Sequence, residues 1–430
     1  MIGADQRRFG AIIGFSMKPI YQTLMPGALL LSWLYAMSAS ASQLTLMQAC
    51  ELAEQHSPVL QMARGQMQAT QAALETAVAY PNPDIEFGTG GSRLYPPTVQ
   101  NGHNSLLGLS QPLELPAVRD ARRRGAEAGV LAGAALFEDA KINLYAQVRQ
   151  AFFEVQRRQD EAQLAKENHD LLLQIRNRVK LSVEVGESPR YELVKSEAES
   201  LTALNAAESA IIRANQAKDR LRVMIGASFL QPFEIVKTAL IETELPPLDR
   251  LREELLQKQP VLKLYAAEAV RAGARLDQER SLRIPQPTLK WSAERHPDVN
   301  LWRIGIAVPL PLWDRRSGPI GEAHANVSRT LADQDRIRIG LLGELDQAYG
   351  RYRIAHGQLN VFEAGLLRNA ELAVKVAEAA YRYGERGILD YLDAQRVLRS
   401  TRLDYLNARY ELQFALIDIQ RLRVADGDSK

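Results

Sequence analysis

Two aspartates near the C-terminal end of the chain, Asp390 and Asp393, have the spacing that points most directly to a chemical role. They stand three residues apart at the expected start of a helix, so both side chains lie on one helix face. Carboxylates gathered in this way attract cations, most strongly where low-dielectric walls confine them. The alternative is local, because acidic residues in a first turn also stabilise a helix through its dipole.

Motifs give no support for an enzyme, so we expect no catalytic residues and no cofactor. The sequence contains no GxxxxGK[ST] phosphate loop, no GxGxxG nucleotide fingerprint and no GxSxG nucleophile motif. Its six histidines lie far apart, without HxxH or HExxH, so we expect no metal-ligating site. The single cysteine, Cys50, excludes a disulfide framework and a CxxC pair.

The overall composition describes a folded chain of balanced charge. Lys and Arg number 53 against 51 Asp and Glu, and 46% of the 430 residues are hydrophobic. That is too apolar and too nearly neutral for a disordered protein. It also lacks the clustered positive charge that nucleic-acid binding requires, so no nucleic-acid partner is expected.

Residues 1–41 have the pattern of an export signal peptide. Lys18 supplies a positive charge, residues 24–35 are apolar, and Ala39-Ser40-Ala41 provides an A-x-A cleavage site. A signal normally begins with its own methionine, which makes Met17 an alternative start. The apolar stretch is too short for a spanning helix, although a membrane anchor stays an alternative. Lipidation at Cys50 is disfavoured by the poor lipobox before it.

The exported part is built from an internal duplication. Residues 57–88 resemble residues 259–292, and residues 183–199 resemble residues 381–397, in the same order and at a nearly constant offset. Ordered matches of this kind indicate two copies of one large unit. We therefore predict four segments: a first repeat over 42–226, a linker over 227–249, a second repeat over 250–425 and a tail over 426–430.

Each copy is expected to contain very long helices. From Gly318 to Tyr383 there is no proline after Pro319, which predicts one helix of about 100 Å at ~1.5 Å per residue. The first copy has a similar run over 117–185. In the second run, apolar residues alternate three and four positions apart as in a coiled-coil seam: Leu345, Ala348, Tyr352, Ala355, Leu359, Phe362 and Leu366. An extended helical bundle is the expected result.

Each copy is also expected to hold two short strands. Apolar and polar residues alternate over 84–89, 288–294 and 301–308. The tryptophans after the signal lie around the second hairpin, as an aromatic belt at a membrane interface would require: Trp291, Trp302 and Trp313. Soluble hairpins show the same alternation. Four strands cannot close a membrane barrel, so the chain either shares a barrel among protomers or does not span the membrane.

Taken together, these features resemble the TolC-type outer-membrane efflux proteins. The resemblance covers residues 43–425 and is most specific in YGERGILDYLDAQRVLRSTRLDYLNARYE, residues 383–411. It implies a mostly α fold with membrane β-structure, in which long coiled-coil hairpins carry four strands per protomer. It further implies a homotrimer in the outer membrane, with a twelve-stranded β-barrel above an α-helical periplasmic tunnel.

Residues 111–128 and 308–323 resemble the cobalt–zinc–cadmium (CzcC) resistance branch of that family. This implies a passive exit duct for divalent heavy-metal cations, surrounded by outer-membrane lipid. Its partners would be a periplasmic adaptor (membrane fusion protein) and an inner-membrane pump of the resistance-nodulation-division (RND) type. Because Ala117-Val118 replaces the Gly-Lys of the branch, drug or type I protein export stays an alternative.

Two readings outside this family are less favoured. An exported coiled-coil structural protein would have no use for alternating strands that carry tryptophan. A periplasmic hydrolase would need a nucleophile and a base at a recognisable spacing, and none stands out.

The resemblance also implies roles at the helix tips, which match residues 185–192 and 381–393 and turn at Gly186 and Gly384. Three residues there resemble the group that holds the tunnel shut: Tyr381, Arg386 and, as the acidic partner on the neighbouring helix, Glu192. Glu192 stands where the family has an aspartate.

Asp390 and Asp393 resemble the acidic ring that narrows the lumen of these channels. From the residues alone, Ser188 and Pro189 are expected to be the N-cap and the first residue of the helix that follows the first tip. On this interpretation Glu192 lies in a first helical turn, where the helix dipole alone would favour an acid.

Overall fold

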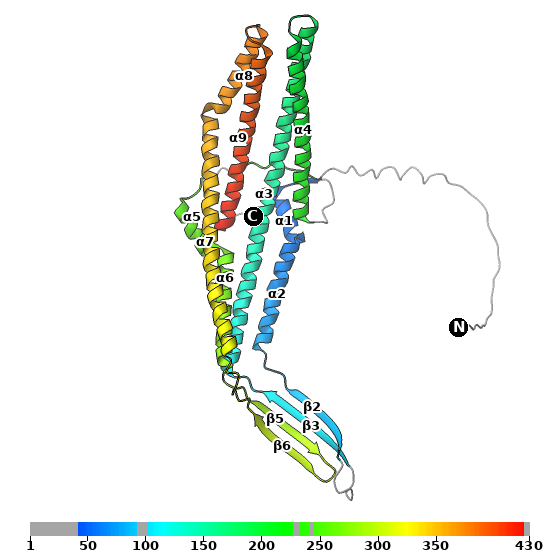
Figure 1. Ribbon diagram of the computed structural model, residues 1–430, viewed down its shortest axis with the longest axis vertical. Coiled ribbons are helices and arrows are strands. Elements are labelled where there is room, and N and C mark those ends of the chain that lie inside the picture. Colours follow the sequence, from blue (N-terminus) through cyan, green and yellow to red (C-terminus); the bar gives the residue numbers. More distant parts are fainter. Residues whose placement is uncertain (1–41, 93–101, 227–232, 241–243, 425–430) are drawn as a thin grey trace, which may run out of the picture.

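The computed structural model describes residues 42–92, 102–226, 233–240 and 244–424. The predicted signal peptide over 1–41 and the tail over 426–430 lie outside these residues. The molecule is elongated, with long helices along its axis and a four-stranded sheet at one end (Figure 1). The predicted fold, mostly helical hairpins with four strands of this kind, is confirmed.

The two repeats have the same order of helices and strands, except that the single helix α3 of the first corresponds to α7, η1 and α8 of the second. The first repeat contains α1 (Leu46–His56), α2 (Pro58–Val78), β2 (Asp84–Ser92), β3 (Gly102–Pro112), α3 (Pro116–Glu184) and α4 (Arg190–Ile225). The second contains α5 (Leu248–Lys258), α6 (Pro260–Ser281), β5 (Thr288–Arg295), β6 (Asn300–Ala307), α7 (Ser317–Val361), the π-helical η1 (Phe362–Leu366), α8 (Leu367–Arg382) and α9 (Ile388–Arg423).

A small sheet between the repeats was not predicted. β1 (Ser42–Leu44) pairs in parallel with β4 (Phe233–Ile235), which lies within the linker. Leu44 and Phe233 are buried in one apolar cluster with side chains of α1, α3 and α4. The linker is therefore packed against the start of the first repeat.

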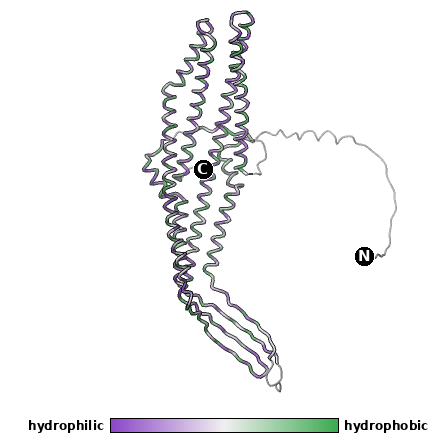
Figure 2. Tube along the Cα trace, in the orientation of Figure 1, coloured by the Kyte–Doolittle hydropathy of each residue, from purple (hydrophilic) through white to green (hydrophobic). Residues whose placement is uncertain are grey.

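The four-stranded sheet has the antiparallel order β2-β3-β5-β6. Residues opposite each other on paired strands share a face, and Figure 2 shows apolar residues recurring along each strand. One face carries Ile85, Phe87, Leu107, Leu109, Leu289, Trp291, Ala293, Trp302, Ile304 and Ile306. The other face carries the charged residues Asp84, Glu86, Lys290, Glu294 and Arg303. The sheet thus has one apolar face that none of the described residues covers.

The three tryptophans lie at different heights along the second hairpin. Trp302 pairs with Ala293 near the β5–β6 turn, and Trp291 pairs with Ile304 in the middle of the strands. Trp313 follows β6 and is 92% exposed. The three side chains therefore lie at different levels of the protomer, and their role at a membrane interface stays a prediction.

The helix predicted from Gly318 to Tyr383 is interrupted. Gly365 in η1 has φ 131° and ψ 1°, which is not helical, whereas α3 runs unbroken over its 69 residues as predicted. The predicted seam is buried at Leu345, Ala348 and Ala355, but Leu366 is 44% exposed. The break rotates the apolar stripe away from Leu366, so the seam prediction is wrong at its last position.

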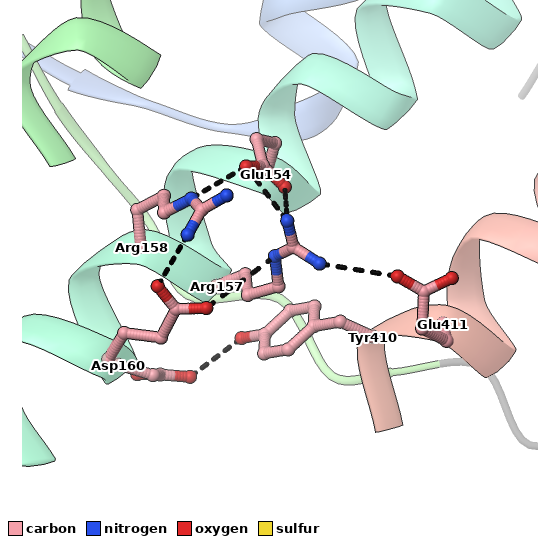
Figure 3. A network of polar contacts seen from close by, with 7 residues as sticks. Glu154, Arg157, Arg158, Asp160, Tyr410 and Glu411 are labelled. Atoms are coloured by element: carbon pink, nitrogen blue, oxygen red, sulfur yellow. Dashed lines mark hydrogen bonds and ion pairs between the residues drawn. The ribbon is translucent and has the colours of Figure 1, made fainter. Parts of the chain in front are cut away.

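A network of charged side chains joins α3 to α9 near the middle of the molecule (Figure 3). Arg157 on α3 lies 2.9 Å from Glu154, 3.8 Å from Glu161 and 3.3 Å from Glu411 on α9. Beside it, the hydroxyl of Tyr410 donates to Asp160 at 2.6 Å. Burial and this hydrogen bond raise the pKa of the Tyr410 phenol, so it stays a donor at any physiological pH.

We predict that Arg157→Ala lowers the thermal midpoint of the protein much more than Glu411→Gln. Arg157 is 15% exposed and links Glu154 and Glu161 to Glu411, and its loss leaves Arg158 as the arginine that pairs with both α3 glutamates, a cost of about 2 kcal/mol. Glu411 is 52% exposed, so its ion pair contributes under about 1 kcal/mol. Thermal unfolding followed by circular dichroism measures both; equal losses would contradict this ranking.

Candidate functional site at the helix tips

The two helix tips turn in the same way. After α3, Gly186 adopts φ 83° and the amide of Glu187 donates back to the carbonyl of Ser182 at 2.8 Å. After α8, Gly384 adopts φ 74° and the corresponding bond is 2.9 Å long. A left-handed glycine with this back-bond ends a helix and reverses the chain within a few residues. Each tip is therefore a short, well-defined turn.

The helix that follows the first tip begins one residue later than predicted. Pro189 is the N-cap residue and Arg190 is the first residue of α4, so Ser188 lies outside the helix. Glu192 is nevertheless in the first turn, where the helix dipole stabilises its negative charge.

Tyr381 is held by an aromatic contact that the sequence analysis did not identify. Its ring stacks on that of Tyr391 with centroids 6.3 Å apart and planes 8° apart. Tyr391 is buried, and its hydroxyl accepts a hydrogen bond from Gln395 at 3.1 Å. Tyr391 and Gln395 stand four residues apart on α9, a spacing that could have suggested one helix face. This contact fixes the end of α8 against the start of α9.

The structure brings Glu192 close to Tyr381. Burial raises the pKa of the Tyr381 phenol, and the negative charge of Glu192 raises it further. A Cβ added at Gly387 would lie 3.7 Å from Oε1 of Glu192, so this carboxylate approaches the N-cap residue of α9. Glu192 therefore connects the tip of the first repeat with the tip of the second.

Arg386 has a different partner from the one predicted. Within the protomer it forms an ion pair with Asp390 on the following helix at 3.4 Å, not with Glu192. An i,i+4 contact costs less side-chain ordering than one across helices, which favours this local pair.

Asp390 and Asp393 are both exposed on α9, and each has an arginine close by. Asp390 pairs with Arg386, and Asp393 lies 4.0 Å from Arg396, which also bonds Glu199 of α4 at 2.8 Å. Asp390 is in the first turn of α9, so the dipole explanation holds for it as well. The two carboxylates share a face as expected, with part of their charge compensated.

The described residues contain no group of three or more His, Cys, Asp or Glu side chains arranged to hold a metal ion. None of the helices in this part of the chain is long and apolar enough to cross a membrane.

Comparison with known proteins relates both repeats to one family. The family model described as "Outer membrane efflux protein" matches residues 49–227 and 251–423. The chain is also 26% identical over 385 residues to the cobalt-zinc-cadmium resistance protein CzcC of Cupriavidus metallidurans, covering 89% of this chain and 90% of that protein.

Solved structures have the same fold. A membrane protein from Pseudomonas aeruginosa is similar with a TM-score of 0.79 and 17% identity, over 89% of this chain and 91% of that one. The CmeC outer membrane channel of Campylobacter jejuni gives 0.77 and 17%, over 88% and 85%. CusC, described as forming a transmembrane channel, gives 0.78 and 18%, over 88% and 91%. At these identities the likeness concerns the fold.

We predict that Glu192→Gln lowers the pKa of the Tyr381 phenol, because a nearby negative charge disfavours the phenolate and its removal makes ionisation easier. Burial persists, so the pKa should stay above that of a free tyrosine. Phenolate absorbance, taken as the difference from Tyr381→Phe in each background, measures it. Glu187→Gln in the same tip is the control, and an equal shift in both variants would refute the contact.

Proposed function

Because the chain belongs to the outer membrane efflux protein family, we propose that it is the outer-membrane channel of a tripartite efflux system for divalent heavy-metal cations. The observation that carries this proposal is the match of the family to both repeats, combined with similarity to CzcC over nearly the whole chain. The name of that relative supplies the proposed substrate class: cobalt, zinc and cadmium.

The sheet supports a shared barrel. β2 and β6 are its edge strands, and the apolar face exposes large side chains such as Phe87 and Ile304. Backbone groups on an open edge are too costly to leave unpaired in lipid. Three copies joined edge to edge would satisfy them in a twelve-stranded barrel, with the apolar face toward outer-membrane lipid. The helices would then continue as a periplasmic tunnel.

The remaining parts of the system follow from this arrangement. A passive duct needs an energy source elsewhere, which an inner-membrane RND pump would provide, and a periplasmic adaptor would join the two. The helix tips lie at the end of the molecule opposite the sheet, where such partners would meet the tunnel (Figure 1). We assign the outer membrane as the location of the protein.

At the entrance we propose that Tyr381, Arg386 and Glu192 hold the tips together. The stack of Tyr381 on Tyr391 and the approach of Glu192 to Gly387 support this role. Asp390 and Asp393 would form the acidic ring, with Arg386 and Arg396 limiting its charge.

The substrate class is tested by deleting the gene and challenging the strain separately with zinc, cobalt, cadmium, copper and lipophilic drugs. We expect resistance to zinc, cobalt or cadmium to fall and to return when the intact chain is supplied. Loss of drug resistance alone would favour drug export, and a secretion defect alone would favour type I protein export. Either result would overturn the metal assignment.

The ring is tested by single-channel recording in a planar bilayer. Six carboxylates around one axis should bind multivalent cations from the periplasmic side and block the current. Asp390→Asn combined with Asp393→Asn should remove the block and lower cation selectivity. Asp404→Asn, an exposed aspartate on the same helix, is the control. A double mutant that melts the protein but keeps its selectivity would identify helix caps instead.

A further inference from the structure

The strands and the long helices meet at one level of the protomer (Figure 1). We call this level the joint and define it as residues 79–83, 113–119, 280–287 and 308–316. Leu113 extends the pairing of β3 with β5, because its amide donates to the carbonyl of Pro287 at 2.8 Å. Arg316, the N-cap residue of α7, bonds the buried Glu279 of α6 at 3.1 Å. The joint is therefore a connected band between the sheet and the helices.

The joint exposes large apolar and aromatic side chains. Their exposed fractions range from 42% for Leu113 to 92% for Trp313, and the set is Tyr80, Leu113, Ile284, Leu310, Leu312 and Trp313. Because successive side chains of a strand point to opposite faces, Leu113 lies on the same face as Leu107 and Leu109. The apolar surface of the sheet thus continues into the joint, and an exposed apolar surface of this kind marks a contact with a partner or a membrane.

Four arginines of the joint have no carboxylate partner among the described residues. The guanidinium of Arg119 bonds the last carbonyl of α2 at 3.0 Å and lies 3.9 Å from the centre of the Tyr80 ring. Arg280, Arg283 and Arg315 are exposed, and their side chains form no hydrogen bond or ion pair with a described residue. Positive charge thus lies beside the exposed apolar side chains.

The acidic residues of the joint are already bonded within the protomer. The joint contains five arginines and two acidic residues, a net charge of +3. Glu114 is almost fully buried and bonds Arg122 at 2.6 Å. Asp314 accepts a hydrogen bond from the backbone amide of Arg316 at 2.7 Å. The positive charge at this level is therefore available to an anion from outside the protein.

The length of the strands indicates where the joint would lie in a membrane. β3 has 11 residues and β5 and β6 have 8 each, which corresponds to about 26–36 Å at ~3.3 Å per residue. A strand tilt of about 40° reduces this height to about 20–28 Å, close to the apolar band of about 25 Å that outer-membrane barrels expose to lipid. When the sheet spans that band, the joint lies at the level of the lipid headgroups.

We propose that the joint binds the headgroups of anionic phospholipids in the membrane leaflet on the helical side of the sheet. The proposal rests on the outer-membrane location proposed above and adds a lipid partner to it. Arginine pairs with phosphate oxygens in bidentate geometry, and the rings of Tyr80 and Trp313 are of the kind that lies at headgroup level. The acyl chains would contact Ile284 and Leu310, which free phosphate could not do. Because both acids are engaged, none is left for the ammonium group of a zwitterionic headgroup.

The test uses Trp313 as a fluorescent reporter at the joint. Trp291→Phe combined with Trp302→Phe leaves Trp313 as the one tryptophan after residue 41. This reporter protein is inserted into phosphatidylcholine vesicles that contain either brominated phosphatidylglycerol or brominated phosphatidylcholine. Bromine on a neighbouring acyl chain quenches the fluorescence, so the two quenching curves give the relative affinity of the joint for the anionic and the zwitterionic lipid.

We expect the reporter protein to prefer phosphatidylglycerol by about tenfold, since each arginine near a lipid surface adds to the attraction. Replacing Arg280, Arg283 and Arg315 together by glutamine should reduce the preference to about twofold, whereas replacing them by lysine should keep about fivefold. The matched control removes the same charge from three exposed arginines away from the joint and should keep the preference: Arg213→Gln, Arg338→Gln and Arg353→Gln.

Equal quenching by both lipids in the reporter protein would overturn the proposal, even if the glutamine variant fails to fold. A control variant that loses the preference as fully as the joint variant would also overturn it, because net charge alone would then explain the effect. If Trp313 escapes quenching while the unaltered chain is quenched through Trp291 and Trp302, the joint lies outside the membrane and only this proposal fails. If neither protein is quenched, the proposed outer-membrane function fails with it.

Discussion

An open-edged sheet with one apolar face is the constraint on which the rest of the structure depends. The backbone groups on the outer sides of β2 and β6 need partners, and Phe87, Trp302 and Ile304 need an apolar surrounding. The helices repeat the order of the strands, because α2 packs on α3, α3 on α6 and α6 on α7. A second copy that pairs with the backbone of β2 or β6 therefore also contacts the outer helices, α2 or α7. The same assembly of copies thus forms both the barrel and the tunnel.

The duplication provides two similar halves that differ in their long helices. α3 is unbroken and carries Arg157 and Asp160, which bind the other repeat. The corresponding helix of the second repeat is divided at Gly365. At the tips, Ile388 and Tyr391 of α9 are buried in one apolar cluster with Val179 of α3. The two halves are therefore joined by polar bonds near the middle and by apolar packing near the tips.

Sequence patterns predicted the structural features that depend on residues close together along the chain. Periodicity located α3 and the strands, and glycine marked both tips, because these signals are local. β1 and β4 were missed since each is only three residues long and its partner is almost two hundred residues away. The break was missed because Leu366 completes an apparent heptad. The ion pair of Arg386 with Asp390 within the protomer was not identified, because only the fold shows which acidic residue lies beside Arg386.

The charges at the helix tips favour the passage of cations over their retention. A ring of uncompensated carboxylates would hold divalent cations tightly and slow their release, since attraction grows with confinement and net charge. Arg386 beside Asp390 and Arg396 near Asp393 reduce that net charge. Arg386 lies just before α9 and Arg396 lies on it, so each arginine stays beside the aspartate that it compensates. The entrance can then attract and bind cations without holding them tightly.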